Sequence, residues 1–208
     1  MTTISNVLYW ISTGLMVPVI VLLIIFFVRA LMLIGSFFGQ YTSQQRVVRT
    51  IYCLIERLTP DTLVHFAESL PATSNTLMLK YVQQILKNRN DEARVDFLLA
   101  EYEMDAAKNI STSKVLTKMG PILGLMGTLI PMGPALVGLA TGDIASMAYN
   151  MQVAFATTVV GLVVCAIGFL TQHIKERWAL RNLTMLEYVA EVVKQSKKQD
   201  DEATQIVG

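Results

Sequence analysis

Three long apolar runs alternate with polar stretches along the chain. The first extends from Val7 to Val28 and has no charged residue before Arg29, the second from Met119 to Ala140, and the third from about Tyr149 to Gln172. With a rise of about 1.5 Å per helical residue, each run is long enough to cross a hydrocarbon core of about 30 Å. The pattern therefore predicts three transmembrane helices, the last two joined by a short loop over residues 141–148.

A cleaved signal peptide is the rival interpretation of the first run. However, no Lys or Arg precedes it, the apolar stretch is too long, and no pair of small residues marks a cleavage site after it. Tyr9 and Trp10 lie near its beginning, as aromatic residues do at a membrane interface. We therefore expect a permanent membrane anchor.

The positive charges are unevenly distributed between the two sides of these runs. None precedes Arg29 and none lies in the 141–148 loop, whereas residues 41–114 contain nine and the tail after the third run contains six. The positive-inside rule places the N-terminus and the loop outside and the two charged regions in the cytoplasm. Arg29 is expected to snorkel into water at the inner boundary, and a functional role inside the bilayer is the less favoured alternative.

The predicted fold class is an all-α integral membrane protein with three transmembrane helices and long cytoplasmic helical extensions. Its regions are residues 1–40 (first helix with a short external N-terminus), 41–114 (cytoplasmic helices), 115–175 (transmembrane hairpin) and 176–208 (cytoplasmic helical tail with a disordered end).

Capping residues divide the cytoplasmic region into helices. Thr59-Pro60-Asp61 is a start signal for a short helix that ends at Pro71. A second helix is expected over Asn75–Lys87. Asn90-Asp91 then caps a long helix that has no strong stop before Gly120, so it can continue into the second transmembrane run.

The tail looks like a continuation of the third transmembrane helix. It carries an apolar stripe that suggests packing against a partner helix, formed by Leu180, Leu183, Leu186, Val189 and Val193. From Gln195 onward the chain is polar, and we expect that end to be disordered.

Composition and motif content argue against an enzyme. Of the 208 residues 53% are hydrophobic and only 16% are charged, compared with about a quarter in ordinary soluble domains. The chain has no Gly-rich phosphate loop and no nucleophile motif. Cys53 and Cys165 lie far apart, as do His65 and His173, so no metal-ligand spacing is present. We expect no catalytic residue, metal, cofactor or nucleic-acid partner.

Small residues recur along both helices of the predicted hairpin. In the second run Gly124 and Gly127 belong to a series with steps of three, four or seven, and in the third run Gly161 and Gly168 belong to a similar series. Because lipid tails are as apolar as leucine, helices associate in membranes through close packing that small residues permit. These glycines are expected to pack the two helices together.

Hydroxyl groups are the second feature of the hairpin. Thr128, Thr157 and Thr158 lie at similar depths, and rings of them around an oligomer could pass a proton or small cation. The alternative is that each threonine only bonds its own helix backbone. The two runs contain no Asp, Glu, Lys or Arg, so ion-driven work would need a carboxylate from another polypeptide.

Two motifs in the hairpin resemble those of the MotA/TolQ/ExbB proton channel family, with a layout most similar to TolQ and ExbB. They are Gly124-Leu125-Met126-Gly127-Thr128 and Ala156-Thr157-Thr158-Val159-Val160-Gly161-Leu162. The resemblance implies a pentamer around a dimer of single-span partners of ExbD, TolR or MotB type, each with an intramembrane Asp. It also implies that Thr128 and Thr158 line the pore and face that Asp.

The chain departs from the family pattern in two places. Pro131 stands where many relatives have Gly, with Pro134 close behind, and Val153, beside Gln152, stands where TolQ- and ExbB-like relatives carry Glu. The stretch MQVAFATT, from Met151 to Thr158, is more similar to the MotA branch.

The leading hypothesis is an ion-conducting stator subunit of a membrane motor in the cell membrane, driven by protons or sodium. Thr128, Thr157 and Thr158 would line the path. The alternatives are a structural membrane scaffold and a transporter subunit, and the latter is disfavoured because the chain has no internal repeat.

Overall fold

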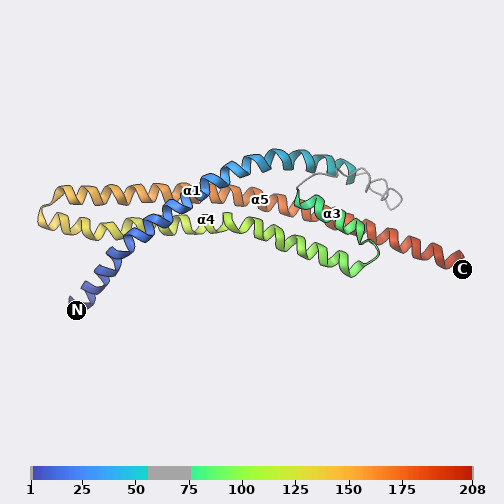
Figure 1. Ribbon diagram of the computed structural model, residues 1–208, viewed down its shortest axis with the longest axis horizontal. Helices are drawn as coiled ribbons and strands as arrows, with labels where there is room; N and C mark the ends of the chain where they lie inside the picture. Colours follow the sequence, from blue (N-terminus) through green and yellow to red (C-terminus); the bar gives the residue numbers. More distant parts are fainter. Residues whose placement is uncertain (1, 56–75, 208) are drawn as a thin grey trace. The chain divides into compact units, whose positions relative to one another are not determined.

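A computed structural model describes residues 2–55 and 76–207, and all regular structure within them is α-helical. The helices are α1 (Thr2–Ile55), α3 (Leu77–Lys87), α4 (Glu92–Thr141) and α5 (Ile144–Val207) (Figure 1). Helices α1, α4 and α5 each contain a stretch long and apolar enough to cross a membrane, which in α1 is Trp10–Phe37. The predicted all-α class and the three membrane-capable helices are therefore confirmed.

The hairpin between α4 and α5 is tighter than the sequence predicts. Only Gly142 and Asp143 separate the helices, rather than the whole stretch 141–148. Gly142 adopts a left-handed φ of 77°, and the Asp143 amide donates to the Gly138 carbonyl at 2.8 Å, which closes α4. The Asp143 carboxylate accepts from the Ser146 amide at 3.0 Å and so caps α5 at once.

The long helix predicted to run into the second transmembrane segment is present as α4. Its start is capped by Asp91, whose carboxylate accepts from the Arg94 amide at 3.0 Å. Helix α3 begins at Leu77 rather than at Asn75, with Thr76 as its N-cap residue. The helix predicted between Thr59 and Pro71 lies outside the described residues.

Helix α5 continues to Val207, where the sequence analysis expects a disordered end. The stretch from Gln195 onward contains three Gln and two Lys residues, which have high helix propensity, so an existing helix can extend through it. The low apolar content of this stretch gives little driving force for tertiary packing, but it does not change the helix preference of these residues.

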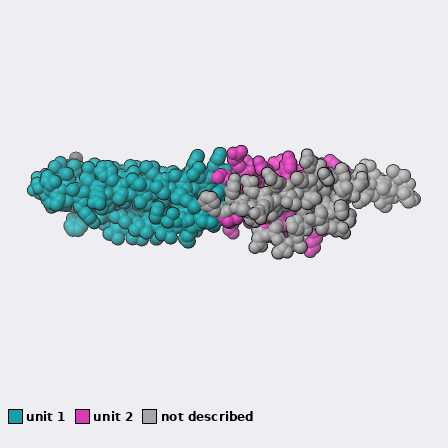
Figure 2. All heavy atoms as spheres, turned by 90° about the horizontal axis from the view of Figure 1, so that it is seen from above, with its two compact units in different colours: residues 1–37, 111–173 teal, residues 38–110, 174–208 magenta. Residues whose placement is uncertain are grey.

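The chain forms two compact units, shown in teal and magenta in Figure 2. Unit 1 comprises residues 1–37 and 111–173, and unit 2 comprises residues 38–110 and 174–208. In unit 1, α1 packs on the α4–α5 hairpin through two small apolar clusters. One is built on Ala30, Leu33, Leu116 and Val164, and the other on Val19, Leu23 and Leu123.

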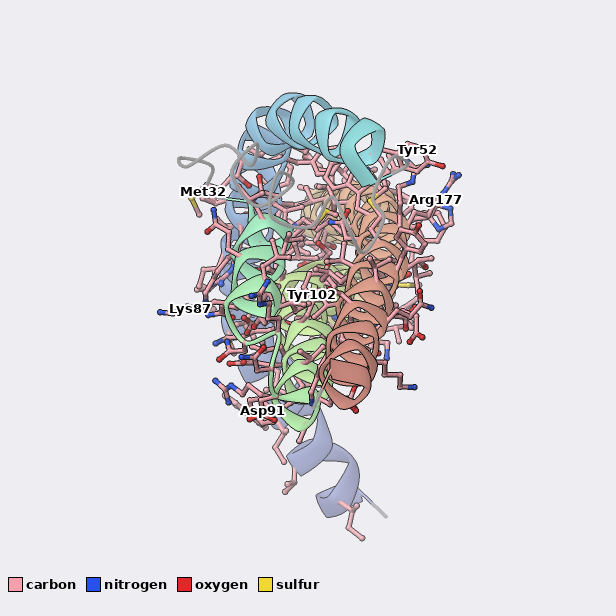
Figure 3. All side chains as sticks on the ribbon, turned by 90° about the vertical axis from the view of Figure 1, so that its right-hand side faces the viewer. Met32, Tyr52, Lys87, Asp91, Tyr102 and Arg177 are labelled. Carbon is pink, nitrogen blue, oxygen red and sulfur yellow. The ribbon has the colours of Figure 1, made fainter. Side chains whose placement is uncertain are left out.

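Unit 2 has a larger apolar core, in which α3 lies against α4 and α5. Its fully buried side chains include Tyr81, Met78, Ile85, Leu98, Leu186 and Val189. Figure 3 shows Tyr102 between these three helices, whereas Lys87 and Arg177 point outward. The apolar stripe predicted in the tail packs within the chain itself, but Leu180 is 66% exposed and does not join it.

A tyrosine pair organises this core. The Tyr81 hydroxyl donates to the Asp105 carboxylate at 2.9 Å, and its ring meets that of Tyr102 edge-on, with centroids 5.5 Å apart. Burial, followed by the contact with Asp105, raises the pKa of Tyr81 to about 12. The phenol therefore stays protonated and holds α3 to α4.

Candidate functional site

Helices α4 and α5 touch backbone to backbone in the membrane part of unit 1. A Cβ atom added to Gly161 would lie 2.7 Å from the Gly120 carbonyl oxygen and 2.9 Å from the Gly124 Cα. A Cβ on Gly120 would in turn lie 2.7 Å from the Gly161 carbonyl oxygen. Because these neighbours are main-chain atoms, no side chain fits here unless the helices separate.

The other glycines of the two series differ in how tightly they are packed. A Cβ on Gly127 would meet the Thr157 hydroxyl oxygen at 2.5 Å, and one on Gly168 would meet the Thr117 amide nitrogen at 2.7 Å. For Gly124 the nearest atom, the Gly161 Cα, would be 3.5 Å away, which is an ordinary contact. Gly120 is thus more constrained than Gly124, although the family motif begins only at Gly124.

The three threonines singled out by the sequence occupy two different environments. Thr157 is only 6% exposed and fills the space beside Gly127 between the helices. Thr128 and Thr158 are half-buried, so each has part of its side chain outside the α4–α5 contact. The structure therefore separates one packing position from two accessible ones.

All three hydroxyls donate to carbonyls of their own helix. Thr128 donates to Leu125 at 2.7 Å, whereas Thr157 and Thr158 both donate to the Ala154 carbonyl, at 2.9 and 3.1 Å. These bonds fix the side-chain rotamers and leave the oxygen lone pairs free to accept. The accessible hydroxyl oxygens of Thr128 and Thr158 can therefore contact water or a cation while each hydroxyl keeps its hydrogen bond to its own helix.

A second hydroxyl cluster lies farther along the same contact and was missed by the sequence analysis. The side-chain oxygens of Thr171 and Ser113 lie 3.3 Å apart, and both residues are buried. Thr117 joins them by donating to the Ser113 carbonyl at 2.9 Å. The cluster could have been found by extending the small-residue spacing, since Thr171 follows Gly168 by three and Thr117 precedes Gly120 by three.

Pro121 leaves one carbonyl of α4 without its helical hydrogen-bond donor, and a side chain of α5 supplies a donor instead. Proline has no amide hydrogen, so the Thr117 carbonyl loses its usual helical donor. The Cys165 thiol lies 3.3 Å from that oxygen and donates to it across the helix contact. Pro131 and Pro134 also lie inside α4 without ending it, as membrane helices allow.

The site contains acceptors but no group that titrates near neutral pH within the transmembrane runs of the hairpin. In the part of the chain that the structure describes, no three His, Cys, Asp or Glu side chains gather as a metal site would require. The arrangement can pack helices tightly and present hydroxyl oxygens. It has no proton carrier of its own.

Comparison with known proteins covers the hairpin and most of its helical extensions. The model of the MotA/TolQ/ExbB proton channel family matches residues 72–188, which is more than half of the chain. A search of curated proteins gave no match. With both hairpin motifs and the close α4–α5 contact inside the matched range, the chain belongs to the MotA/TolQ/ExbB proton channel family.

Proposed function

We propose that the protein is an ion-conducting stator subunit of a membrane motor, which couples a flow of protons or sodium ions to movement of a single-span partner. Thr128 and Thr158 line the ion path. Thr157 forms its wall by holding α5 against Gly127. The glycines Gly124, Gly127, Gly161 and Gly168 keep the hairpin compact around the partner.

Family membership supports the general part of this proposal. Proteins of this family are channel and stator subunits rather than enzymes, and they form oligomeric channels with single-span partners. The three membrane-capable helices make this chain a membrane protein.

One observation carries the assignment of the path. Thr128 and Thr158 are half-buried hydroxyls within helices that contain no Asp, Glu, Lys, Arg or His between Met119 and Ala140 or between Tyr149 and Gln172. A hydroxyl oxygen can solvate a cation but cannot carry a proton through a cycle of charge and discharge. The carboxylate that does so comes from the partner, in our proposal an Asp in its single transmembrane helix.

The proposed assembly is a pentamer around a dimer of that partner, in the inner or plasma membrane. The N-terminus and the Gly142–Asp143 turn face outward, and unit 2 lies in the cytoplasm, because the positive charges are concentrated in residues 41–114 and in the tail. In this orientation the Thr128 and Thr158 hydroxyls lie inside the membrane, between the two aqueous phases.

Native mass spectrometry of the complex purified in mild detergent from its own host tests the assembly. We expect a mass of five copies plus two copies of a small single-span protein with an intramembrane Asp. A monomer or dimer without such a partner would contradict the shared pore.

Valine substitution tests the path itself. In the reconstituted complex, Thr128→Val and Thr158→Val should each abolish ion flux into vesicles, because valine keeps the shape but removes the oxygen. Thr128→Ser should retain flux, and Thr141→Val is a control, since Thr141 makes the same kind of bond to its own helix (3.1 Å to the Val137 carbonyl) at the hairpin turn. Wild-type flux in both path variants, with the assembly intact, would remove the threonine path.

A membrane scaffold is the second candidate function. It is favoured by one observation, that all three hydroxyls already donate within their own helices, which a purely structural threonine also does. A scaffold predicts that both valine variants retain full function in the host, so the same experiment separates the two candidates.

A further inference from the structure

An exposed, uncharged stripe runs along the outer side of α4 in unit 2. Its members recur in steps of four, three, four and three, and they are Ala93, Phe97, Ala100, Met104 and Ala107. Phe97 is 50% exposed and Met104 63%. The opposite side of the same helix turn carries the buried residues Val95, Leu98 and Tyr102. We refer to the outer set as the α4 stripe.

Lipid does not account for the α4 stripe. Ala107 precedes the apolar run at Met119 by about 18 Å of helix, and charged residues flank the stripe. An ordinary solvated helix face is polar, as α3 shows with its exposed Lys80, Gln83 and Lys87. Apolar and small positions at heptad spacing with charged flanks are typical of a face that receives another helix.

The outer face of α5 in the same unit has the complementary character. Leu180 is its most exposed apolar residue, at 66%, and the surrounding exposed residues include Arg181 and Glu191. Each face points away from the other helix, because the residues that join α4 to α5, such as Tyr102 and Asn182, lie on the inner sides. The α4–α5 pair therefore presents two different surfaces on opposite sides.

The contacts within the pair set the heights of these residues along the helices. Tyr102 is hydrogen-bonded to Asn182, and the Lys175 ammonium lies 3.4 Å from the Asn109 carbonyl oxygen. Counting along the antiparallel helices from these contacts, Glu191 is level with Ala93, one residue before Arg94. By the same count Leu180 and Arg181 are level with Met104 and within one turn of Glu101.

We infer that the α4 stripe binds the outer face of α5 of a second copy of this chain. This rests on the proposed homo-oligomer. Copies related by rotation about the membrane normal keep their heights, so Leu180 of one copy sits between Ala100 and Ala107 of the next. Arg181 then meets Glu101, and Glu191 meets Arg94.

Side-chain size and symmetry support a second copy of the chain as the partner that binds the α4 stripe. The alanines allow helix axes to approach to about 8 Å, close enough for Leu180 to fill the space between them. Because the two surfaces differ and lie on opposite sides, the contact is head to tail, and such contacts generate rings when the rotation closes. The match ends toward the membrane where Arg177, which is level with Ala107 by the same count, comes within one residue of the height of the like-charged Lys108.

Disulfide trapping between two tagged forms of the full chain tests the contact. One form carries Ala107→Cys and the other Leu180→Cys, both with Cys53→Ser and Cys165→Ser, and they are co-expressed and oxidised in the membrane. We expect a disulfide that joins the two tags. As a control, Lys87→Cys on the exposed end of α3 replaces Leu180→Cys and should give at least tenfold less product.

Charge reversal supplies an independent readout on the same contact. Glu101→Arg or Arg181→Glu should each lower the trapped fraction by roughly two- to fivefold, as expected for loss of a surface pair, and the double variant should restore it. No recovery in the double variant would count against the pairing of Glu101 with Arg181.

The failures of this inference and of the proposed function are distinguishable. An intact oligomer by native mass spectrometry without the disulfide between tags would overturn the contact and leave the ion path standing. A photo-crosslinker placed at Met104 that joins only a different polypeptide, or only residues of its own chain, would overturn the choice of occupant.

Discussion

Helices α4 and α5 pack against each other twice, and the two regions use different physics. In the membrane part the contact is made by main-chain atoms, so that a Cβ atom added to Gly161 would lie within 3 Å of backbone atoms of Gly120 and Gly124. In unit 2 the same two helices are held apart by large side chains such as Tyr102, Leu186 and Val189, and α3 completes the core.

The solvent explains the difference. In water, burying a large apolar side chain contributes about 1.5–3 kcal/mol, so a core of tyrosine, leucine and valine holds unit 2 together. In lipid that gain is absent, and close packing and polar contacts between helices remain as the main attractive terms. The two regions should therefore respond differently to the same kind of substitution.

Gly161→Leu should have the largest effect. The added side chain would start 2.7 Å from the Gly120 carbonyl oxygen, so α4 and α5 must separate along the membrane part. We expect loss of the folded oligomer in detergent size-exclusion chromatography. Gly14→Leu is the matched control, because a Cβ at Gly14 meets no atom within 4 Å, and its elution should match wild type. Normal assembly of the Gly161 variant would show that the backbone contact is not required.

Leu186→Ala should destabilise unit 2 by creating a cavity in its core, rather than by a steric clash. Leu186 is fully buried, and such truncations cost about 2–5 kcal/mol. Chemical unfolding of the purified protein measures the loss. Leu129→Ala provides the comparison, since Leu129 is 62% exposed on the membrane part of α4 and its truncation should cost much less. Equal losses at the two leucines would contradict the contrast between the regions.

High pH should weaken unit 2 through Tyr81. Its pKa is raised from 10.0 to about 12, so the folded protein holds this proton more tightly than the unfolded chain does. Stability is then fully present below about pH 10 and falls as the pH rises toward 12, by about 2–3 kcal/mol in total. Thermal unfolding of wild type and Tyr81→Phe between pH 9 and 12 measures it. A pH slope that persists unchanged in the variant would assign the loss to another group.

Lys194→Ala should have the smallest effect. Lys194 and Asp96 form an ion pair of 2.6 Å at the end of unit 2, but the Asp96 side chain is 61% exposed. Exposed pairs contribute about 0.2–1 kcal/mol and are screened by salt. The difference from wild type in unfolding free energy should shrink further at high salt. A loss comparable to that of Leu186→Ala would show that charge, rather than the apolar core, holds α4 and α5 together in unit 2.

Local patterns determined much of this protein. The apolar runs specified three membrane-capable helices, Asp91 specified the start of α4, and the lack of a stop signal before Gly120 specified its continuity. Both family motifs could be read from residues 124–128 and 156–162. These features depend on neighbours within a few residues, where periodicity and capping act.

The tertiary structure decided which of the candidate residues share an environment. It placed Thr157 between the helices and left Thr128 and Thr158 half-buried. It also left no room for a side chain at Gly120, whereas a Cβ atom at Gly124 would make only ordinary van der Waals contacts. It also brought Ser113 to Thr171 across the hairpin. Spacing along one helix tells which residues share a face, but the register and approach of two helices depend on the two-residue turn and on every contact between them. Those quantities exist only once α4 and α5 are packed.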